Sequence, residues 1–157
     1  FMDYVNELND SFEKDTFYYG GALNPYSENL EVTIERVKKK IGAGAKYLLT
    51  QPVYNQEGIE NIAKIKKATG VKILGGIMPL VSLRNARFLH YEFPGINIPE
   101  EVMAQFDESM SRNENEEVGV KIAAELASRM KAHVDGFYFM TPFNRAGMVA
   151  KVIRKVQ

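Results

Sequence analysis

The sequence has no cysteine and only two histidines, His90 and His133, among its 157 residues. A disulfide framework, a thiolate nucleophile and a cysteine-ligated metal site are therefore excluded. The two histidines stand far apart in the sequence, which excludes a histidine-rich metal site as well. We assign neither histidine a role, and we expect no bound metal.

An excess of either charge is also missing, because 20 basic residues balance 20 acidic residues. Proteins that bind nucleic acids or anionic membranes normally carry a basic excess, so neither partner is expected. No apolar run approaches the length of about 20 residues that a membrane-spanning helix needs. The first residues mix charged and apolar positions, unlike a signal peptide. A soluble, cytoplasmic protein is the default expectation.

Hydrophobic residues make up 45% of the chain, and their spacing predicts helices that alternate with short apolar strands. We expect strands at 16–23, 46–50, 71–78 and 136–140. We expect helices at 2–12, 30–41, 56–68, 83–91, 118–130 and 146–156, with a short helix beginning near Pro99. Ser27 and Asn55 are the expected N-caps of two helices, and the polar stretch 111–117 is predicted to be a loop.

Four strand–helix units with strands that are apolar throughout predict a parallel sheet buried on both faces. The pattern fits half of an eightfold (β/α)8 barrel, and it fits an open, doubly wound sheet equally well. A glycine-rich GxGxxG turn follows none of the strands, so a Rossmann fingerprint is missing. In both architectures ligands bind at the carboxyl ends of the strands, so the loops there hold the candidate site residues.

Polar residues that follow the strands are the candidates. Gln51 ends a strand, and its amide can both donate to and accept from a flat heterocycle such as a pterin or a flavin. Arg145 follows the last strand and can bind a carboxylate or phosphate as a fork. Lys40 can reach a phosphate or ribose from its helix. For each of these residues, and for Asn24 and Asn85, an ordinary structural role in a turn or on a helix surface is the alternative.

No acid, base or nucleophile stands at the carboxyl end of a strand, where barrel enzymes place their catalytic groups. The chemistry then belongs either to a cofactor or to residues outside this sequence. An aldolase-type lyase needs a lysine at that end. Lys46 and Lys72 lie at strand starts instead, which disfavours such an enzyme.

Several segments together resemble the methylenetetrahydrofolate reductase family, in the right order and spacing from about residue 17 to the end. The segments are NP at 24–25, KKKIGAGAKYLLTQPVYN at 38–55, GGIMPLVSLRNARF at 75–88, PGINIPEE at 94–101 and GFYFMTPFNRAGM at 136–148. The TQPVYN and TPFNR variants are most similar to the bacterial bifunctional form, which is fused behind a homocysteine S-methyltransferase domain.

The resemblance implies a flavin-containing (β/α)8 TIM barrel, of which this chain is the C-terminal half. Strands five to eight then fall within 16–157, a single-domain fragment, and 1–15 is the preceding helix. The family passes a hydride from NADH or NADPH to FAD and then to 5,10-methylenetetrahydrofolate, giving 5-methyltetrahydrofolate. Its carboxylates at the ends of strands one and four have no counterpart here. We therefore assign no catalytic residue and expect the isolated chain to be inactive.

The resemblance also implies roles for the loop residues. Gln51, Asn85 and Arg145 are expected to bind the folate substrate, and Asn24 and Lys40 are expected to bind FAD. Gln51 matches a glutamine that contacts the pterin and, in the other half-reaction, the nicotinamide. Asn85 stands where the family has a glutamine, and Asn24 stands where single-function enzymes often have a histidine.

Three further expectations follow from the resemblance. Thr33 stands where single-function enzymes have an FAD-binding aspartate, which implies a different or weaker hold on the adenosine side. A half-barrel leaves two sheet edges open, so we expect either a homo-oligomer in which two copies close one barrel or pairing with the missing N-terminal half. A non-catalytic flavin- or folate-binding half-barrel module is the alternative function.

Overall fold

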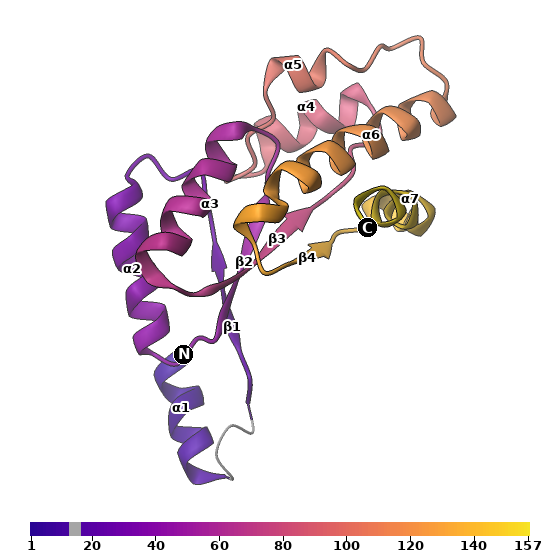
Figure 1. Ribbon diagram of the computed structural model, residues 1–157. Helices are drawn as coiled ribbons and strands as arrows, with labels where there is room; N and C mark the ends of the chain where they lie inside the picture. The colour runs from indigo at the N-terminus through magenta and orange to yellow at the C-terminus, as the bar shows by residue number, and fades with distance from the viewer. Residues whose placement is uncertain (13–16) are drawn as a thin grey trace.

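The computed structural model describes residues 1–12 and 17–157 (Figure 1). Within these residues, four strands alternate with helices along the chain. The strands are β1 (Gly20–Leu23), β2 (Tyr47–Pro52), β3 (Lys72–Ile77) and β4 (Gly136–Phe139). The helices are α1 (Met2–Ser11), α2 (Leu30–Gly42), α3 (Gln56–Thr69), α4 (Leu83–Glu92), α5 (Glu100–Met103), α6 (Arg112–Met130) and α7 (Ala146–Val156), with 3-10 turns η1 (Lys131–His133) and η2 (Pro142–Asn144). The first strand is shorter than predicted, because 17–19 are not part of it and Thr16 lies outside the described residues.

The four strands form one sheet in chain order, β1-β2-β3-β4, and each neighbouring pair is parallel. Parallel strands that follow one another in space as in sequence are the arrangement of a (β/α)8 barrel, whereas a doubly wound sheet reverses its strand order at a switch point. The predicted α/β half-barrel is therefore confirmed. β1 and β4 are the edge strands of the described sheet.

Helices cover one face of this sheet, with α2, α3 and α6 on the same side (Figure 1). Leu48 of β2 and Ile73 of β3 are fully buried in one hydrophobic cluster with Ile62 of α3 and Met130 of α6. Burying each such aliphatic side chain stabilises the fold by about 1.5–3 kcal/mol. Alternate residues such as Leu74 face the opposite side and are partly exposed in the described chain. The expectation of a sheet buried on both faces is wrong here, because the crossover helices of a half-barrel all pass on its outer side.

A second hydrophobic cluster lies beneath the helices that are inserted after β3. It joins α4, α5 and α6 through buried residues that include Leu80, Ile98, Phe106, Ile122 and Leu126. This cluster packs α4 and α5 against the middle of α6.

The ends of α2 and α3 follow ordinary capping chemistry, with one difference from the sequence prediction. Asn29 caps α2 in place of Ser27, and its side chain accepts from the Val32 N–H at 3.1 Å. Both residue types suit an N-cap, but only Asn29 directly precedes the helix. Asn55 caps α3 as predicted. The helix ends at Gly70, which has a φ of +67°, a conformation that favours glycine.

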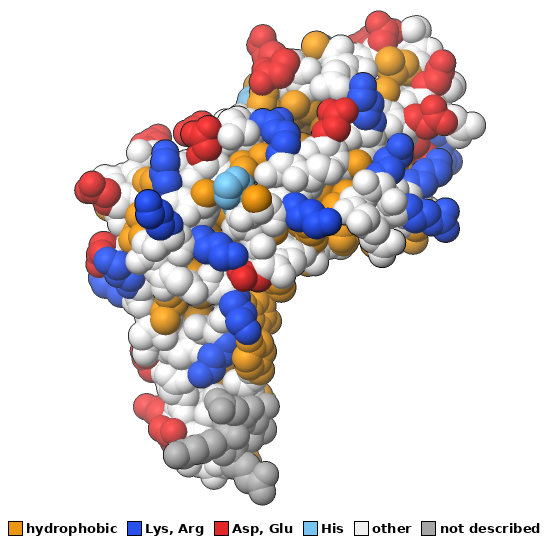
Figure 2. All heavy atoms as spheres, viewed as in Figure 1, with side chains coloured by type: hydrophobic (Ala, Val, Ile, Leu, Met, Phe, Trp, Pro, Cys, Tyr) orange, Lys and Arg blue, Asp and Glu red, His pale blue; other side chains and the backbone are white. Residues whose placement is uncertain are grey.

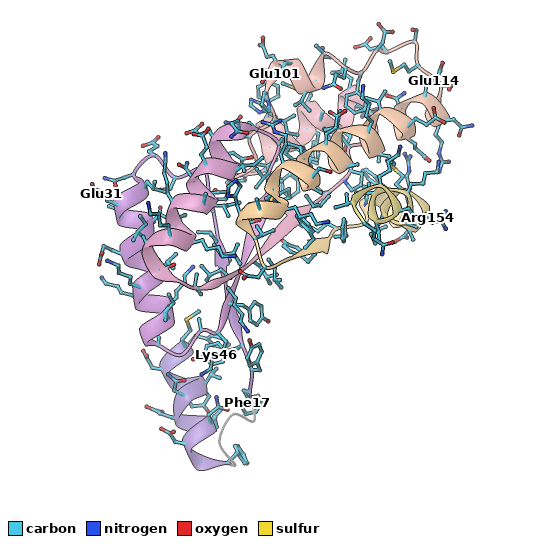
Figure 3. All side chains as sticks on the ribbon, in the orientation of Figure 1. Phe17, Glu31, Lys46, Glu101, Glu114 and Arg154 are labelled. Carbon is cyan, nitrogen blue, oxygen red and sulfur yellow. The ribbon has the colours of Figure 1, made fainter. Side chains whose placement is uncertain are left out.

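The predicted loop at 111–117 is wrong, because α6 begins at Arg112. Ser111 forms a capping box with Glu114: its hydroxyl accepts from the Glu114 N–H, and the Glu114 carboxylate accepts from the Ser111 N–H at 2.7 Å. This reciprocal pair satisfies two donors that would otherwise be unpaired. Figure 3 shows Glu114 at the outer end of α6. The polar composition of this stretch reflects the solvent-exposed start of a helix and not a loop.

Basic and acidic side chains are mixed over the face of the molecule in Figure 2, in keeping with the balanced composition. Among the described residues, no helix combines the length and the hydrophobicity that crossing a bilayer requires.

Candidate functional site

Two pockets open among the residues that follow the strands. The α2 pocket has a volume of about 330 Å³, and its lining includes Asn24, Thr33, Arg36, Lys40 and Gln51. The α4 pocket has a volume of about 440 Å³, and its lining includes Ser82, Arg84, Asn85, Phe88, Phe143 and Arg145. The structure thus brings Asn24, Lys40 and Gln51 together in one pocket, and Asn85 and Arg145 together in another. Gln51 therefore lines the pocket of the expected FAD-binding residues, and not the pocket of the two residues with which it is expected to bind folate.

A bulge in β2 turns Gln51 out of the sheet. The register between β2 and β3 shifts between Leu49 and Pro52, so that the intervening Thr50 and Gln51 depart from regular pairing with β3. Thr50 is 1% exposed and Gln51 is exposed, at the open end of the strand. Bulges often re-aim a side chain near a functional site. The bulge therefore presents the Gln51 amide to the α2 pocket.

Contacts from two neighbouring strands hold this bulge. The Thr50 hydroxyl accepts from the Gly76 N–H at 2.9 Å, and the Tyr138 hydroxyl of β4 donates to the Thr50 carbonyl. Tyr138 can reach across β3 because Gly76 has no side chain: a Cβ there would lie 2.8 Å from the Thr50 carbonyl oxygen and 2.9 Å from the Tyr138 hydroxyl. Partial burial raises the pKa of Tyr138, so its hydroxyl remains a donor at neutral pH.

Two tyrosines, the buried Tyr54 and the partly buried Tyr26, join the loops that follow the first three strands. The Tyr54 N–H donates to the Tyr26 hydroxyl at 2.9 Å, and the Tyr54 hydroxyl donates to the Met78 carbonyl at 2.8 Å. Asn61 of α3 donates to the Pro25 carbonyl at 3.0 Å. Burial raises the pKa of Tyr26 to about 12, and complete burial raises the pKa of Tyr54 further. Both phenols therefore stay neutral, and the loops that carry the two pockets are rigidly connected.

The α2 pocket combines two cations with amide groups. Lys40 does not extend freely into solvent, because its ammonium donates to the Ala22 carbonyl of β1. Arg36 is one turn earlier on the same helix and also lines the pocket. Asn24 uses its side-chain oxygen to accept from the Tyr26 N–H at 2.9 Å, which leaves its NH2 group for a ligand. The Thr33 hydroxyl donates to the Asn29 carbonyl at 3.1 Å, so it can only accept from a ligand.

Asn85 is also oriented by its own helix turn. Its side-chain oxygen accepts from the Val81 N–H at 3.2 Å, and its own N–H donates to the Ser82 hydroxyl at 3.1 Å. The Asn85 NH2 group has no partner among the described residues and lines the α4 pocket. The residue therefore offers a hydrogen-bond donor there, which suits a carboxylate.

An ion pair positions Arg145 in the same pocket. Its Nη1 lies 3.2 Å from Oε1 of Glu116 on α6, outside hydrogen-bond geometry. The two side chains are only 23% and 18% exposed. The same Glu116 oxygen accepts from Arg112 at 3.0 Å. Because one nitrogen of the fork is tied to α6, the rest of the guanidinium remains available to an anion.

The loop between β4 and α7 carries unusual backbone geometry beside this pocket. Phe143 has a φ of +47° and Asn144 has a φ of +59°. Such a conformation costs roughly 1–2 kcal/mol for a residue like phenylalanine. Phe143 is 71% exposed, so burial of its ring does not offset this cost. Strain of this kind clusters at ligand sites, where it holds a group in a useful place.

At the amino ends of the strands, opposite the two pockets, charged residues pair with each other or with backbone groups. Asp135 precedes β4, where it accepts from the Ile73 N–H at 2.8 Å and pairs with Lys66 at 2.9 Å. Lys72 begins β3 and Lys46 precedes β2, so both lysines lie at the amino ends of strands. This placement agrees with the expectation that disfavoured a lysine-dependent lyase.

Several residues that line or support the α2 and α4 pockets were not predicted from the sequence, among them Arg36, Arg84, Glu116 and Phe143. Arg36 could have been found, because it stands three residues after Thr33 and four before Lys40 on one helix face. Arg84 stands next to Asn85 but carries no pattern of its own. Glu116 fell within the stretch that was mistaken for a loop, and nothing in the sequence predicts the backbone of Phe143.

Comparison with known proteins connects this geometry to a family. The methylenetetrahydrofolate reductase family matches residues 1–157, the whole chain. The chain belongs to this family. The family resemblance drawn from the sequence is thereby confirmed, whereas fusion to a methyltransferase domain stays a prediction.

A solved structure shares the fold. An uncharacterized protein from Clostridium thermocellum, which binds two copies of 5-methyl-5,6,7,8-tetrahydrofolic acid, is 20% identical with a TM-score of 0.60. The match covers 98% of this chain and 57% of that protein. The chain therefore spans little more than half the length of this relative.

Proposed function

We propose that this chain forms the C-terminal half of a flavin-dependent methylenetetrahydrofolate reductase barrel. The parent reaction is the reduction of 5,10-methylenetetrahydrofolate to 5-methyltetrahydrofolate by NADH or NADPH. The observation that carries the proposal is the grouping of the expected residues: Asn24, Lys40 and Gln51 line one pocket, and Asn85 and Arg145 line the other. A chain that binds methyltetrahydrofolate, as the Clostridium thermocellum relative does, would use both.

The α2 pocket fits part of an FAD molecule. Arg36 and Lys40 supply positive charge for a diphosphate, and Asn24 supplies NH donors. Because the Thr33 hydroxyl donates to backbone, it can accept a ribose hydroxyl but lacks the charge of a carboxylate. A volume of about 330 Å³ takes only a part of a dinucleotide. This chain therefore holds one portion of FAD, and the remaining strands of the barrel hold the rest.

FAD, when bound, supplies the hydride transfer between the nicotinamide and the folate. The chain's own residues bind and orient. Gln51 donates to and accepts from the edge of a pterin or a nicotinamide, on a strand end that Tyr138 and Gly76 hold in place. Arg145 and the Asn85 NH2 group bind the carboxylate of the folate.

Neither pocket is lined by a carboxylate or a histidine among the described residues. Neither described lining therefore offers the histidine or carboxylate that most often serves as a general acid or base. We infer that the chain alone is catalytically inactive and needs the other half of the barrel, either as a separate segment or from a second copy. A reductase assay on the purified chain tests this inference, and measurable turnover would contradict it.

The visible absorption spectrum of the chain, after incubation with FAD and desalting, tests the cofactor site. Retained flavin bands would support the site. We expect Lys40→Met to reduce the retention and Lys39→Met to leave it unchanged, because Lys39 is exposed and does not line the pocket. If both variants retain FAD equally well, Lys40 does not hold it.

The second candidate function is a non-catalytic flavin- or folate-binding half-barrel. The absence of a carboxylate from the described lining of both pockets favours it. Binding without turnover, even when the missing strands are supplied, would establish this alternative. We also propose that the protein is cytoplasmic and that its parent carries a homocysteine S-methyltransferase domain.

A further inference from the structure

A third cavity lies outside the two pockets described above. This outer cavity has a volume of about 370 Å³ and is bounded by the start of α4, the segment after α5 and the first turn of α6. Its lining consists of Ser82, Leu83, Arg84, Arg87, Asp107, Glu108 and Asn115. It shares Ser82 and Arg84 with the α4 pocket. Its volume falls within the usual range for small-molecule sites, about 300–1,000 Å³.

Asn115 brings an unsatisfied acceptor to this cavity. The residue is only 8% exposed. Its Nδ2 donates to the Met110 and Ser111 carbonyls, both at 3.0 Å, which fixes the orientation of the amide. The oxygen Oδ1 is buried and has no hydrogen-bond partner among the described residues. A buried carbonyl without a donor is unfavourable, so a ligand with an N–H group would stabilise it.

Most other charges of the lining already have partners. Asp107 accepts from the backbone and the hydroxyl of Ser109. Arg87 pairs with Glu108 at 3.4 Å, with both side chains more than half exposed. Arg84 has no ion-pair or hydrogen-bond partner among the described residues and is exposed. One cation and one acceptor therefore remain for a ligand.

The charge balance of the lining narrows the ligand class. Two arginines face one aspartate and one glutamate, so the formal charges cancel. A neutral lining favours a dipolar ligand over a polyanion such as phosphate. An anionic group suits Arg84, and a neighbouring N–H suits Asn115.

We propose that the outer cavity binds an amino-acid unit, that is, a carboxylate whose α-carbon carries an N–H group. Arg84 binds the carboxylate, Asn115 Oδ1 accepts the N–H, and Leu83 contacts the aliphatic stem. Because Oδ1 is covered without a ligand, a lining side chain moves aside.

Two sources can supply this chemistry. One is a free α-amino acid, and this case is independent of the proposed function. The other is an additional glutamyl unit on a folate whose first glutamate occupies the α4 pocket, with Arg84 at the junction of the two sites. This second case rests on the proposed function.

An NMR titration of the isotope-labelled chain tests the site itself, with L-glutamate as the probe and acetate as the control. The reporter is the side-chain amide of Asn115. We expect a saturable shift with glutamate and none with acetate, which lacks the N–H. Arg84→Gln should weaken glutamate binding about tenfold or more, the usual effect of losing a charge-assisted hydrogen bond.

Arg154→Gln is the matched control, because Arg154, labelled in Figure 3, is an exposed arginine on α7 and does not line this cavity. It should leave the binding unchanged. The proposal is overturned if none of the amino-acid or folate probes produces a saturable shift at Asn115. It is also overturned if acetate matches glutamate, or if the two arginine variants lose equal affinity.

Titrations with 5-methyltetrahydrofolate that carries one or two glutamyl units distinguish the sources. Tighter binding of the diglutamyl form, lost in Arg84→Gln, assigns the cavity to the folate tail. Equal binding of the two forms, together with glutamate binding, assigns it to a free amino acid. If glutamate binds and neither folate does, the proposed function fails while the amino-acid site stands.

Discussion

The substitution Gly76→Ala tests the support of Gln51 most directly. A Cβ at this position would lie 2.8 Å from the backbone oxygen of Thr50 and 2.9 Å from the Tyr138 hydroxyl. Both distances are shorter than real Cβ contacts, and the Thr50 oxygen belongs to a backbone that neighbouring strands hold. The new methyl group must therefore displace the strand or the tyrosine.

The expected cost is the sum of two effects with one small offset. Overpacking in a closely packed region costs about 1–3 kcal/mol. Loss of the hydrogen bond from Tyr138 to Thr50 adds about 0.5–1.5 kcal/mol. The reduced entropy of the unfolded chain returns about 0.4–1 kcal/mol. We therefore expect Gly76→Ala to lower the free energy of unfolding by about 0.5–4 kcal/mol.

Urea unfolding followed by circular dichroism measures this change, with Gly147→Ala as the control. Gly147 lies in α7, and nothing is within 4 Å of the position of its Cβ. That variant should be neutral or stabilised by up to about 1 kcal/mol. A double-mutant cycle with Tyr138→Phe adds a sharper test, because removing the hydroxyl removes one of the two close contacts. The reasoning is refuted if Gly76→Ala costs no more than Gly147→Ala, or costs the same in both backgrounds.

Three further predictions concern the remainder of the molecule. Ser111→Ala should destabilise the chain by about 0.5–2 kcal/mol in the same urea assay, because it removes the capping box of α6; an unchanged midpoint would show that the cap is not formed. Burial alone would raise the pKa of Asp135, but hydrogen bonds from Ile73 and Lys66 lower it, helped by the charges of Lys66 and Lys72. The stabilisation from Asp135 is then complete above its ordinary pKa of 3.8 and lost as the pH falls through the lowered value, so the destabilisation by Asp135→Asn should shrink in acid, and a pH-independent difference would contradict this. Open edges at β1 and β4 should produce a light-scattering mass above the 17.8 kDa of one chain, whereas a monomer at high concentration would argue against edge pairing.

The fold could be predicted where the sequence pattern is local. Leu48 and Ile73 lie in short apolar runs bounded by glycine or polar residues, and both became fully buried strand positions. The prediction failed where one composition allows two structures. The polar stretch that begins at Ser111 is hydrophilic because one side of a surface helix is solvated. The signal for this helix is the capping-box pattern, a serine at 111 followed three residues later by Glu114.

The candidate site was predictable in its residues but not in its geometry. Gln51 could be placed at a strand end because a proline follows a short apolar run. The bulge that exposes it depends on the contacts of Thr50 with Gly76, 26 residues away, and with Tyr138, 88 residues away. Contacts of such separation leave no periodic trace in the sequence, so only the folded chain reveals them.

The carboxyl ends and the amino ends of the four strands differ in how well their polar groups are satisfied. At the carboxyl ends of the strands lie the β2 bulge and the residues Phe143 and Asn144, which have positive φ angles. The Asn85 NH2 group there has no partner in the described chain. At the amino ends of the strands, by contrast, the Asp135 carboxylate is satisfied by both the Ile73 N–H and Lys66. Strain and unpaired polar groups cost stability, and they persist where a ligand repays the cost. This distribution of strain, independently of any sequence match, supports the proposal of a binding site at the carboxyl ends of the strands, where barrel enzymes bind their ligands.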